Sequence, residues 1–471
     1  MFTGLMPRGH GVRMNGIPLD WNVPTFTEEL RSAGYATHCV GKVHLRTSNT
    51  PTGVPLDEVA PAEFPEARAL WLSGAIKDLP SPYYGFEGVD YVGGHSTSST
   101  GHYLHWLERE HPAEARQFRD EVALEPPSPA FDLYNRQSFK WALPEAAHPL
   151  TFIADRTVDY LDAAGRQRST AGEGAAARPF LLWSSIQDPH SPFAPPAEWA
   201  HRYDPEEVPP PRLDEGELDR MPPHYRALYE TDVTTSGSLG QAMSATDPYR
   251  AECAVHYFAM IEFVDAQVGR ILSALDRNGL RDDTVVLFTA DHGEALGDHL
   301  MWGKGPYHYD SVIRVPLLLR WPGNFSPGLA IDAPTSLVNL APTVLDTAGL
   351  PIPEGAVPPV REAPNNPPPW PGSSLAQEAS GPGHGNGWAV VEEDEDYLGF
   401  RMRTLVTERY RLTAYSGQPY GELFDFHDDP DEFRNLWDDP GRRGLRDDLR
   451  LELLDKLMTT EHALPRQSGR S

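Results

Sequence analysis

The residues best suited to chemistry lie in one segment in the second half of the chain, between residues 284 and 323. It contains Asp291 and His292, a carboxylate and an imidazole in adjacent positions, and both are donor types that bind divalent metal ions. The polar loop that follows contains Lys304 and His308, which can carry positive charge. A metal-binding tip followed by a basic loop predicts a site for an anion.

Two apolar runs enclose this segment and must position it. Residues 284–288 form a continuous β-branched and apolar run, typical of a strand buried on both faces of a parallel sheet, and residues 315–321 form a second run. Asp291 closely follows the first run, at the end where a parallel strand presents side chains to a cleft. The amphipathic spacing within residues 250–278 predicts a helix that leads into this strand.

Two further strand ends carry basic residues. Residues 35–40 are expected to form a strand, and Lys42 and His44 follow it. Residues 179–186 are expected to form another fully buried strand, whose proline-rich end presents His190. The alternative interpretation is a surface lysine and ordinary packed histidines. Four more histidines have polar surroundings that give no sign of paired ligands; they are residues 95, 102, 105 and 111.

Several of these segments, in this order, resemble type I sulfatases of the alkaline-phosphatase superfamily. The motifs are GLMPRGHGVRMNG near the start, then GKVH, PHSPF, DHGE with a lysine 13 positions after its aspartate, and RVPLLLRWPG. Each motif alone is moderate support, and their order along nearly the whole chain strengthens the resemblance. It implies an α/β fold with an alkaline-phosphatase-like, mostly parallel central sheet flanked by helices.

The C-terminal part is expected to form a separate unit. Short strand patterns and an amphipathic helix at 445–458 predict a small C-terminal antiparallel sheet with a helix. The resulting domains are a sulfatase catalytic domain at 1–350, a proline- and glycine-rich linker at 351–387 and a C-terminal subdomain at 388–471.

The resemblance also implies roles for the basic and acidic residues. Asp291 and His292 would bind one divalent metal ion, Ca²⁺ by analogy with the family or Mn²⁺ because of the imidazole. Lys42 and Lys304 would neutralise the oxygens of a sulfate ester, and a protonated His190 would donate to the leaving group.

Other histidines are alternatives for these roles. His44 is an alternative general acid, and His308 is a weaker candidate for substrate binding. His299 is also a weaker candidate, equally suited to a supporting position behind the site.

Two features of the family are absent from the sequence. The family nucleophile is a formylglycine made within a C/S-x-P-S-R motif, and no such motif occurs here; nor does any Asp-Asp pair follow a buried strand. We therefore expect the natural protein to extend upstream of Met1, and the polypeptide as printed to be unstable and catalytically inactive. Two alternatives stay open, namely a phosphonate monoester or phosphodiester hydrolase of the same superfamily and a non-catalytic anion-binding pseudoenzyme.

The composition of the chain excludes several classes of binding partner. A formal net charge of −28 over 471 residues argues against nucleic acid as a partner. No apolar run approaches the roughly 20 residues of a membrane-spanning helix. The two cysteines, Cys39 and Cys253, suggest neither a disulfide framework nor a zinc site. The expected ligand is a sulfated small molecule or glycan. Oligomeric state and compartment are left open, with a slight preference for the cytoplasm.

Overall fold

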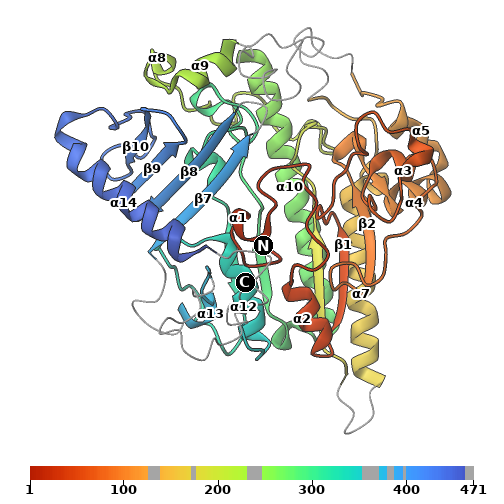
Figure 1. The fold of residues 1–471 in the computed structure, drawn as a ribbon. Helices are drawn as coiled ribbons and strands as arrows, with labels where there is room; N and C mark the ends of the chain where they lie inside the picture. The colour runs from red at the N-terminus through yellow and green to blue at the C-terminus, as the bar shows by residue number, and fades with distance from the viewer. Residues whose placement is uncertain are drawn as a thin grey trace. The chain divides into compact units, whose positions relative to one another are not determined.

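The computed structural model describes residues 1–125, 138–170, 177–230, 247–352, 371–378, 387–395 and 399–461. The chain divides into two compact units, each built from separate sequence ranges (Figure 1). The first unit comprises Met1–Glu29, Pro211–Met243 and Val285–Ser471, and the second comprises Leu30–Pro210 and Ser244–Thr284.

The second unit contains a four-stranded sheet in the order β3-β2-β1-β4. Its strands are β1 (Ala36–Gly41), β2 (Gly88–Gly93), β3 (Thr100–Gly101) and β4 (Phe180–Ser185). β1 is parallel to both β2 and β4, whereas the short β3 is antiparallel to β2. The predicted parallel sheet is therefore confirmed, and its order brings the carboxyl ends of β1, β2 and β4 to one edge.

Helices cover this sheet and supply most of its core. The long helices α7 (Pro149–Thr170) and α10 (Asp247–Arg277) pack against each other. Gly165 of α7 permits their close approach, because a Cβ there would lie 2.5 Å from Oδ1 of Asn278. The shorter helices are α3 (Arg68–Leu72), α4 (His102–Glu110) and α5 (Pro112–Arg119). The buried core includes Tyr103, Leu107, Trp141, Phe152 and Ile153.

The first unit contains two separate sheets. β5 (Val286–Thr289) and β6 (Leu317–Arg320) form an antiparallel pair. The second sheet has the order β10-β9-β8-β7 and is antiparallel throughout. Its strands are β7 (Trp388–Glu395), β8 (Phe400–Thr407), β9 (Tyr410–Tyr415) and β10 (Gly421–Asp425).

Helix α14 (Arg443–Thr459) runs along this C-terminal sheet, as Figure 1 shows. Leu449 and Leu453 of α14 are buried with Leu405, Leu412 and Leu423 of the strands. This arrangement confirms the small antiparallel sheet with a helix. The unit also contains α1 (Pro7–His10), α8 (Glu217–Arg220), α9 (Pro223–Glu230), α11 (Asp310–Ile313), α12 (Leu340–Thr347) and α13 (Leu375–Glu378). Helix α2 (Phe26–Ser32) lies where the ranges of the two units meet in sequence.

Part of the predicted linker lies outside the described residues, namely 353–370 and 379–386. In the described part, residues 371–378, α13 packs on α12. The side-chain amide of Asn339 donates to the carbonyl oxygen of Ser373 at 3.0 Å. This part of the proline-rich segment therefore packs on the unit, where the composition had predicted an unpacked connection.

Two strands are less buried than the sequence predicted. The segments 179–186 and 284–288 were expected to be buried on both faces, but every residue of β4 is half-buried and Phe288 of β5 is 38% exposed. The sheet order supplies the reason. β4 is an edge strand, and β5 has β6 as its partner in an antiparallel pair, which covers less of each strand than a central position would. Across the described residues, no helix is long and apolar enough to cross a bilayer.

Candidate functional site

In the second unit, basic residues follow each of the three parallel strands. Lys42 follows β1, His95 follows β2 and His190 follows β4. The strands approach closely here, since a Cβ on Gly41 would lie 1.9 Å from the carbonyl oxygen of Ser185. Gly41 also has a φ of 103°, so glycine is required at this position on two grounds. The three parallel strands thus bring three basic side chains to the end of the sheet where the strands' carboxyl ends lie.

The side chains of these residues meet. Nζ of Lys42 lies 2.6 Å from Nε2 of His95. The rings of His95 and His190 are stacked, with 3.6 Å between centroids and 6° between planes. Nδ1 of His190 lies 2.6 Å from the carbonyl oxygen of Ser191 and donates to it, which leaves Nε2 as the ring nitrogen for other partners. Lys42 and His190, both predicted site residues, are therefore brought to the same imidazole.

His95 is the residue that the sequence analysis missed. It was grouped with His102, His105 and His111 as a polar histidine without a partner. A usable signal was present, because His95 follows the strand at 88–93 much as Lys42 follows the strand at 36–41. What the sequence did not supply was the order of the strands, which places β2 beside β1.

The loop after Lys42 is held by a buried carboxylate. His44 is exposed and has a left-handed φ of 55°. Oε1 of Glu66 accepts hydrogen bonds from the backbone N–H groups of Leu45 and Arg46, both at 2.9 Å, and from the hydroxyl of Tyr83 at 2.6 Å. Burial raises the pKa of Glu66, and these hydrogen bonds oppose that shift. Glu66 therefore holds the conformation of the loop that carries His44.

In the first unit, Asp291 and His292 lie in the turn after β5. The Asp291 side chain is 71% exposed, and its Oδ1 accepts the backbone N–H of His292 at 3.0 Å. Nδ1 of His292 donates to the carbonyl oxygen of Gly293 at 2.7 Å, and Nε2 lies 3.7 Å from Oδ2 of Asp291. Gly293 is pressed against helix α11, because a Cβ there would lie 2.1 Å from the carbonyl oxygen of Ser311. The turn is thus fixed by its own backbone contacts.

Lys304 shares the electrostatic environment of this turn. Its partial burial lowers the pKa of the ammonium, while the carboxylates of Asp291 and Glu294 raise it. Glu294 in turn accepts hydrogen bonds from the backbone N–H groups of Gly303 at 2.5 Å and Leu296 at 3.2 Å. The loop of Lys304 is therefore tied to the turn that carries Asp291 and His292.

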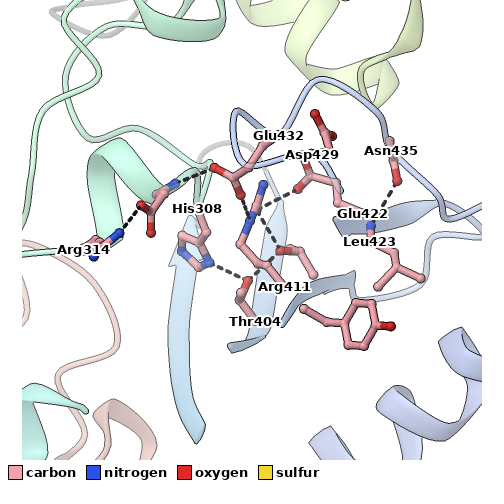
Figure 2. A network of polar contacts seen from close by, with 12 residues as sticks. His308, Arg314, Thr404, Arg411, Glu422, Leu423, Asp429, Glu432 and Asn435 are labelled. Atoms are coloured by element: carbon pink, nitrogen blue, oxygen red, sulfur yellow. Dashed lines mark hydrogen bonds and ion pairs between the residues drawn. The ribbon is translucent and has the colours of Figure 1, made fainter. Parts of the chain in front are cut away.

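His308 and His299 are engaged elsewhere in the first unit. In Figure 2, His308 joins a polar network on the C-terminal sheet, where its Nδ1 lies 2.7 Å from Oγ1 of Thr404. Its Nε2 lies 3.1 Å from Oε2 of Glu393. Both of its ring nitrogens thus have structural partners. Nδ1 of His299 lies 2.5 Å from Oε1 of Glu217, and its ring stacks on Tyr309. These contacts hold both rings in place, and substrate binding by His308 stays a prediction.

The same network surrounds a fully buried arginine (Figure 2). Nε of Arg411 donates to Oε1 of Glu432 at 2.5 Å, and the guanidinium lies over the rings of Tyr309 and Phe424. Glu422, also buried, lies 3.8 Å from Nη1 of Arg411. The network stabilises the C-terminal sheet. It gives the buried carboxylates of Glu422 and Glu432 a cationic partner.

A metal ion was expected at Asp291 and His292. The described residues contain no group of three or more His, Cys, Asp or Glu side chains that could hold a metal ion. Asp291 and His292 supply one carboxylate and one imidazole, and the Nδ1 hydrogen bond of His292 leaves Nε2 as the nitrogen with a lone pair. The chemistry of these two donors fits part of a metal coordination shell.

The strands and helices described above have the alkaline-phosphatase-like fold. The solved phosphonate monoester hydrolase of Agrobacterium radiobacter superposes with a TM-score of 0.73 at 24% identity, covering 98% of this chain and 85% of that chain. Its counterpart from Silicibacter pomeroyi has a TM-score of 0.68 at 23% identity, with the same coverage. At these identities the likeness concerns the fold.

Sequence comparison then gives the family. The sulfatase family profile matches residues 1–350, so the chain belongs to the sulfatase family and thereby to the sulfuric ester hydrolases. An uncharacterized sulfatase of Escherichia coli, YidJ, is 26% identical over 97% of this chain and 76% of its own length. The arylsulfatase of Clostridium perfringens is 26% identical over 93% of this chain and 78% of its own. The choline-sulfatase of Rhizobium meliloti is 26% identical over 93% of this chain and 72% of its own length.

Proposed function

We propose that this chain supplies the substrate-binding residues of an enzyme that hydrolyses sulfate monoesters, with a sulfated small molecule or glycan as substrate. The observation that carries the proposal is the meeting of Lys42 and His190 at one sheet edge through His95. Relatives named arylsulfatase and choline-sulfatase support a sulfate ester as the substrate class.

Electrostatics is the main contribution we assign to these residues. The ammonium groups of Lys42 and Lys304 would neutralise the non-bridging sulfuryl oxygens, where negative charge lies in the transition state. His190 would act as general acid. Its Nδ1–H is directed to Ser191, so the protonated ring would present Nε2–H to the leaving oxygen. His44 is the alternative general acid, and its exposed position on a loop held by Glu66 supports that option.

Asp291 and His292 are the residues that would hold a divalent ion, Ca²⁺ or Mn²⁺. Such an ion would supply positive charge that orients the nucleophile and the ester. We propose a formylglycine as the nucleophile, by resemblance to the family. Because the printed chain contains no C/S-x-P-S-R motif, we expect this polypeptide alone to bind esters without hydrolysing them.

Calorimetric titration with 4-nitrophenyl sulfate, in Ca²⁺ and in Mn²⁺, tests the proposal. We expect Lys42→Met and Lys304→Met each to weaken binding about tenfold or more, since each removes a charged contact of about 1.5–3 kcal/mol. Wild-type affinity in both variants would refute the proposed roles. Robust turnover of the ester by the printed chain would refute the expected inactivity.

A second candidate is hydrolysis of phosphonate monoesters or phosphodiesters. His292 favours it, because an imidazole ligand suits Mn²⁺ better than Ca²⁺. A relative from Trinickia caryophylli, a multifunctional alkaline phosphatase superfamily protein, is 26% identical over 74% of this chain and 62% of its own length. Titration with a phenylphosphonate ester separates the two candidates. Tighter binding of the phosphonate in Mn²⁺ than of the sulfate in Ca²⁺ would favour the second.

A further inference from the structure

The ring of His95 lies in contact with both Lys42 and His190, and no role in the proposed chemistry has yet been given to it. We propose that His95 is a positioning residue, which orients the Lys42 ammonium through its Nε2 and holds the His190 ring by stacking. The inference rests on the proposed function, because that function directs Lys42 and His190 to the ester.

The backbone of His95 is held in place by several contacts. Its N–H donates to Oγ of Ser98 at 3.0 Å, and that hydroxyl donates to the carbonyl oxygen of His95 at 2.8 Å. The preceding Gly94 has a φ of 74°, and a Cβ on it would lie 2.4 Å from the carbonyl oxygen of Ser98. The turn that presents His95 is therefore tightly constrained, as a positioning role requires.

A buried amide connects this turn to the strand end that carries His190. Nε2 of Gln187, which is 8% exposed, donates to the carbonyl oxygens of Gly94 at 2.9 Å and Val92 at 3.2 Å. Gln187 lies between β4 and His190 in sequence, so its amide links the end of β4 to the end of β2. This link keeps the two imidazole rings at their stacking distance.

The chemistry of the contact fixes the protonation of His95. An ammonium group has donors and no acceptor, so Nε2 of His95 accepts when Lys42 is protonated. A ring that accepts at Nε2 orients the ammonium without cancelling its charge, and it permits His190 to be protonated without a second imidazolium at 3.6 Å.

The protonation can be measured without any substrate. In protein with ¹⁵N-labelled histidine, long-range ¹H–¹⁵N spectra distinguish the two tautomers, and the His95 signals are assigned by their loss in His95→Phe. We expect Nε2 of His95 to be unprotonated at neutral pH, and we expect Lys42→Met to change the ¹⁵N shifts of the His95 ring. A proton on Nε2, or His95 signals that do not respond to Lys42→Met, would overturn the inference.

Binding variants then separate the acceptor from the stacking ring. With 4-nitrophenyl sulfate as the probe, we expect His95→Phe, which keeps an aromatic ring, to weaken binding about tenfold through loss of a charged hydrogen bond. His95→Gln keeps an acceptor oxygen, and we expect it to stay within about threefold of wild type. The matched control is His201→Gln, because Nδ1 of His201 also contacts a lysine, Lys140, at 3.1 Å but the ring is exposed. We expect no change for this control.

A double-mutant cycle distinguishes positioning from a structural effect. If His95 acts through Lys42, Lys42→Met/His95→Phe should bind no more weakly than Lys42→Met alone. Additive losses would overturn the inference. If wild-type protein binds neither the sulfate nor a phosphonate ester, the proposed function fails. In that case the tautomer measurement still decides whether His95 orients Lys42.

Discussion

Glu66 offers a sharp test of how the loop beside the site is held. One atom of its carboxylate, Oε1, accepts three hydrogen bonds, from Leu45, Arg46 and Tyr83. Glu66→Ala removes this acceptor and leaves the three donors behind. Glu66→Gln can keep an oxygen at the same position and removes only the charge.

The burial of the three donors determines how much stability Glu66→Ala should lose. Tyr83 is fully buried, so its hydroxyl loses its partner in a place that water does not reach, at a cost of about 1–3 kcal/mol. The two backbone N–H groups lie in half-buried residues that water can partly solvate, and we assign each a loss of about 0.5–1 kcal/mol. Glu66→Ala should therefore destabilise the protein by about 2–5 kcal/mol in total. Because burial raises the pKa of Glu66, removal of its charge costs little, and Glu66→Gln should stay within about 1 kcal/mol of wild type.

Urea unfolding followed by tryptophan fluorescence measures this difference. Glu58→Ala is the matched control, because Glu58 is an exposed glutamate in the same connection between β1 and β2, and its loss should be small. Ester affinity should fall in Glu66→Ala together with stability, since the loop follows Lys42. If Glu66→Ala unfolds within about 0.5 kcal/mol of wild type, the loop is held by other contacts and the reasoning fails.

Three further predictions concern buried polar and backbone constraints. Burial raises the pKa of Asp188 to about 7 from 3.8, so the folded state retains a proton that the unfolded state has lost. Asp188 should thus contribute a loss of about 1.4 kcal/mol of stability per pH unit as the pH rises between these values, and Asp188→Asn should remove that contribution in urea unfolding at pH 5–7. Gly41→Ala should cost roughly 3 kcal/mol or more, because its Cβ would collide with Ser185; thermal melting checks this. Arg411→Leu should cost about 3–5 kcal/mol by leaving buried Glu432 without its cation, and an unchanged urea midpoint would contradict it.

The sequence was informative where a side chain's position follows from its own strand or helix. The helix at 250–278 and the strand at 35–40 follow from local periodicity, and Lys42 and His190 follow from their places at strand ends. Burial was predicted less well. A continuous apolar run cannot show whether its strand is central or lies at an edge, and β4 lies at an edge.

Contacts between segments that are distant in sequence were also not predicted. His95 meets Lys42 because β2 pairs with β1, across 53 positions of sequence, and no local pattern encodes that pairing. His308 is a second case. Its ring nitrogens contact Thr404 and Glu393 of the C-terminal sheet, and no local pattern in its basic loop indicated these partners. Each difference arises from tertiary pairing and not from a mistaken local element.

An anion site on a chain with a net charge of −28 faces a particular electrostatic problem. The chain's own carboxylates compete for every lysine, and an ion pair would cancel the charge that the substrate requires. The two lysines meet this problem differently. Partial burial lowers the pKa of Lys304, and the carboxylates of Asp291 and Glu294 oppose that shift. Lys42 contacts the imidazole of His95, which can orient the ammonium and, unlike a carboxylate, has no negative charge to cancel it. An acidic residue in place of His95 should therefore hold Lys42 as firmly yet weaken anion binding.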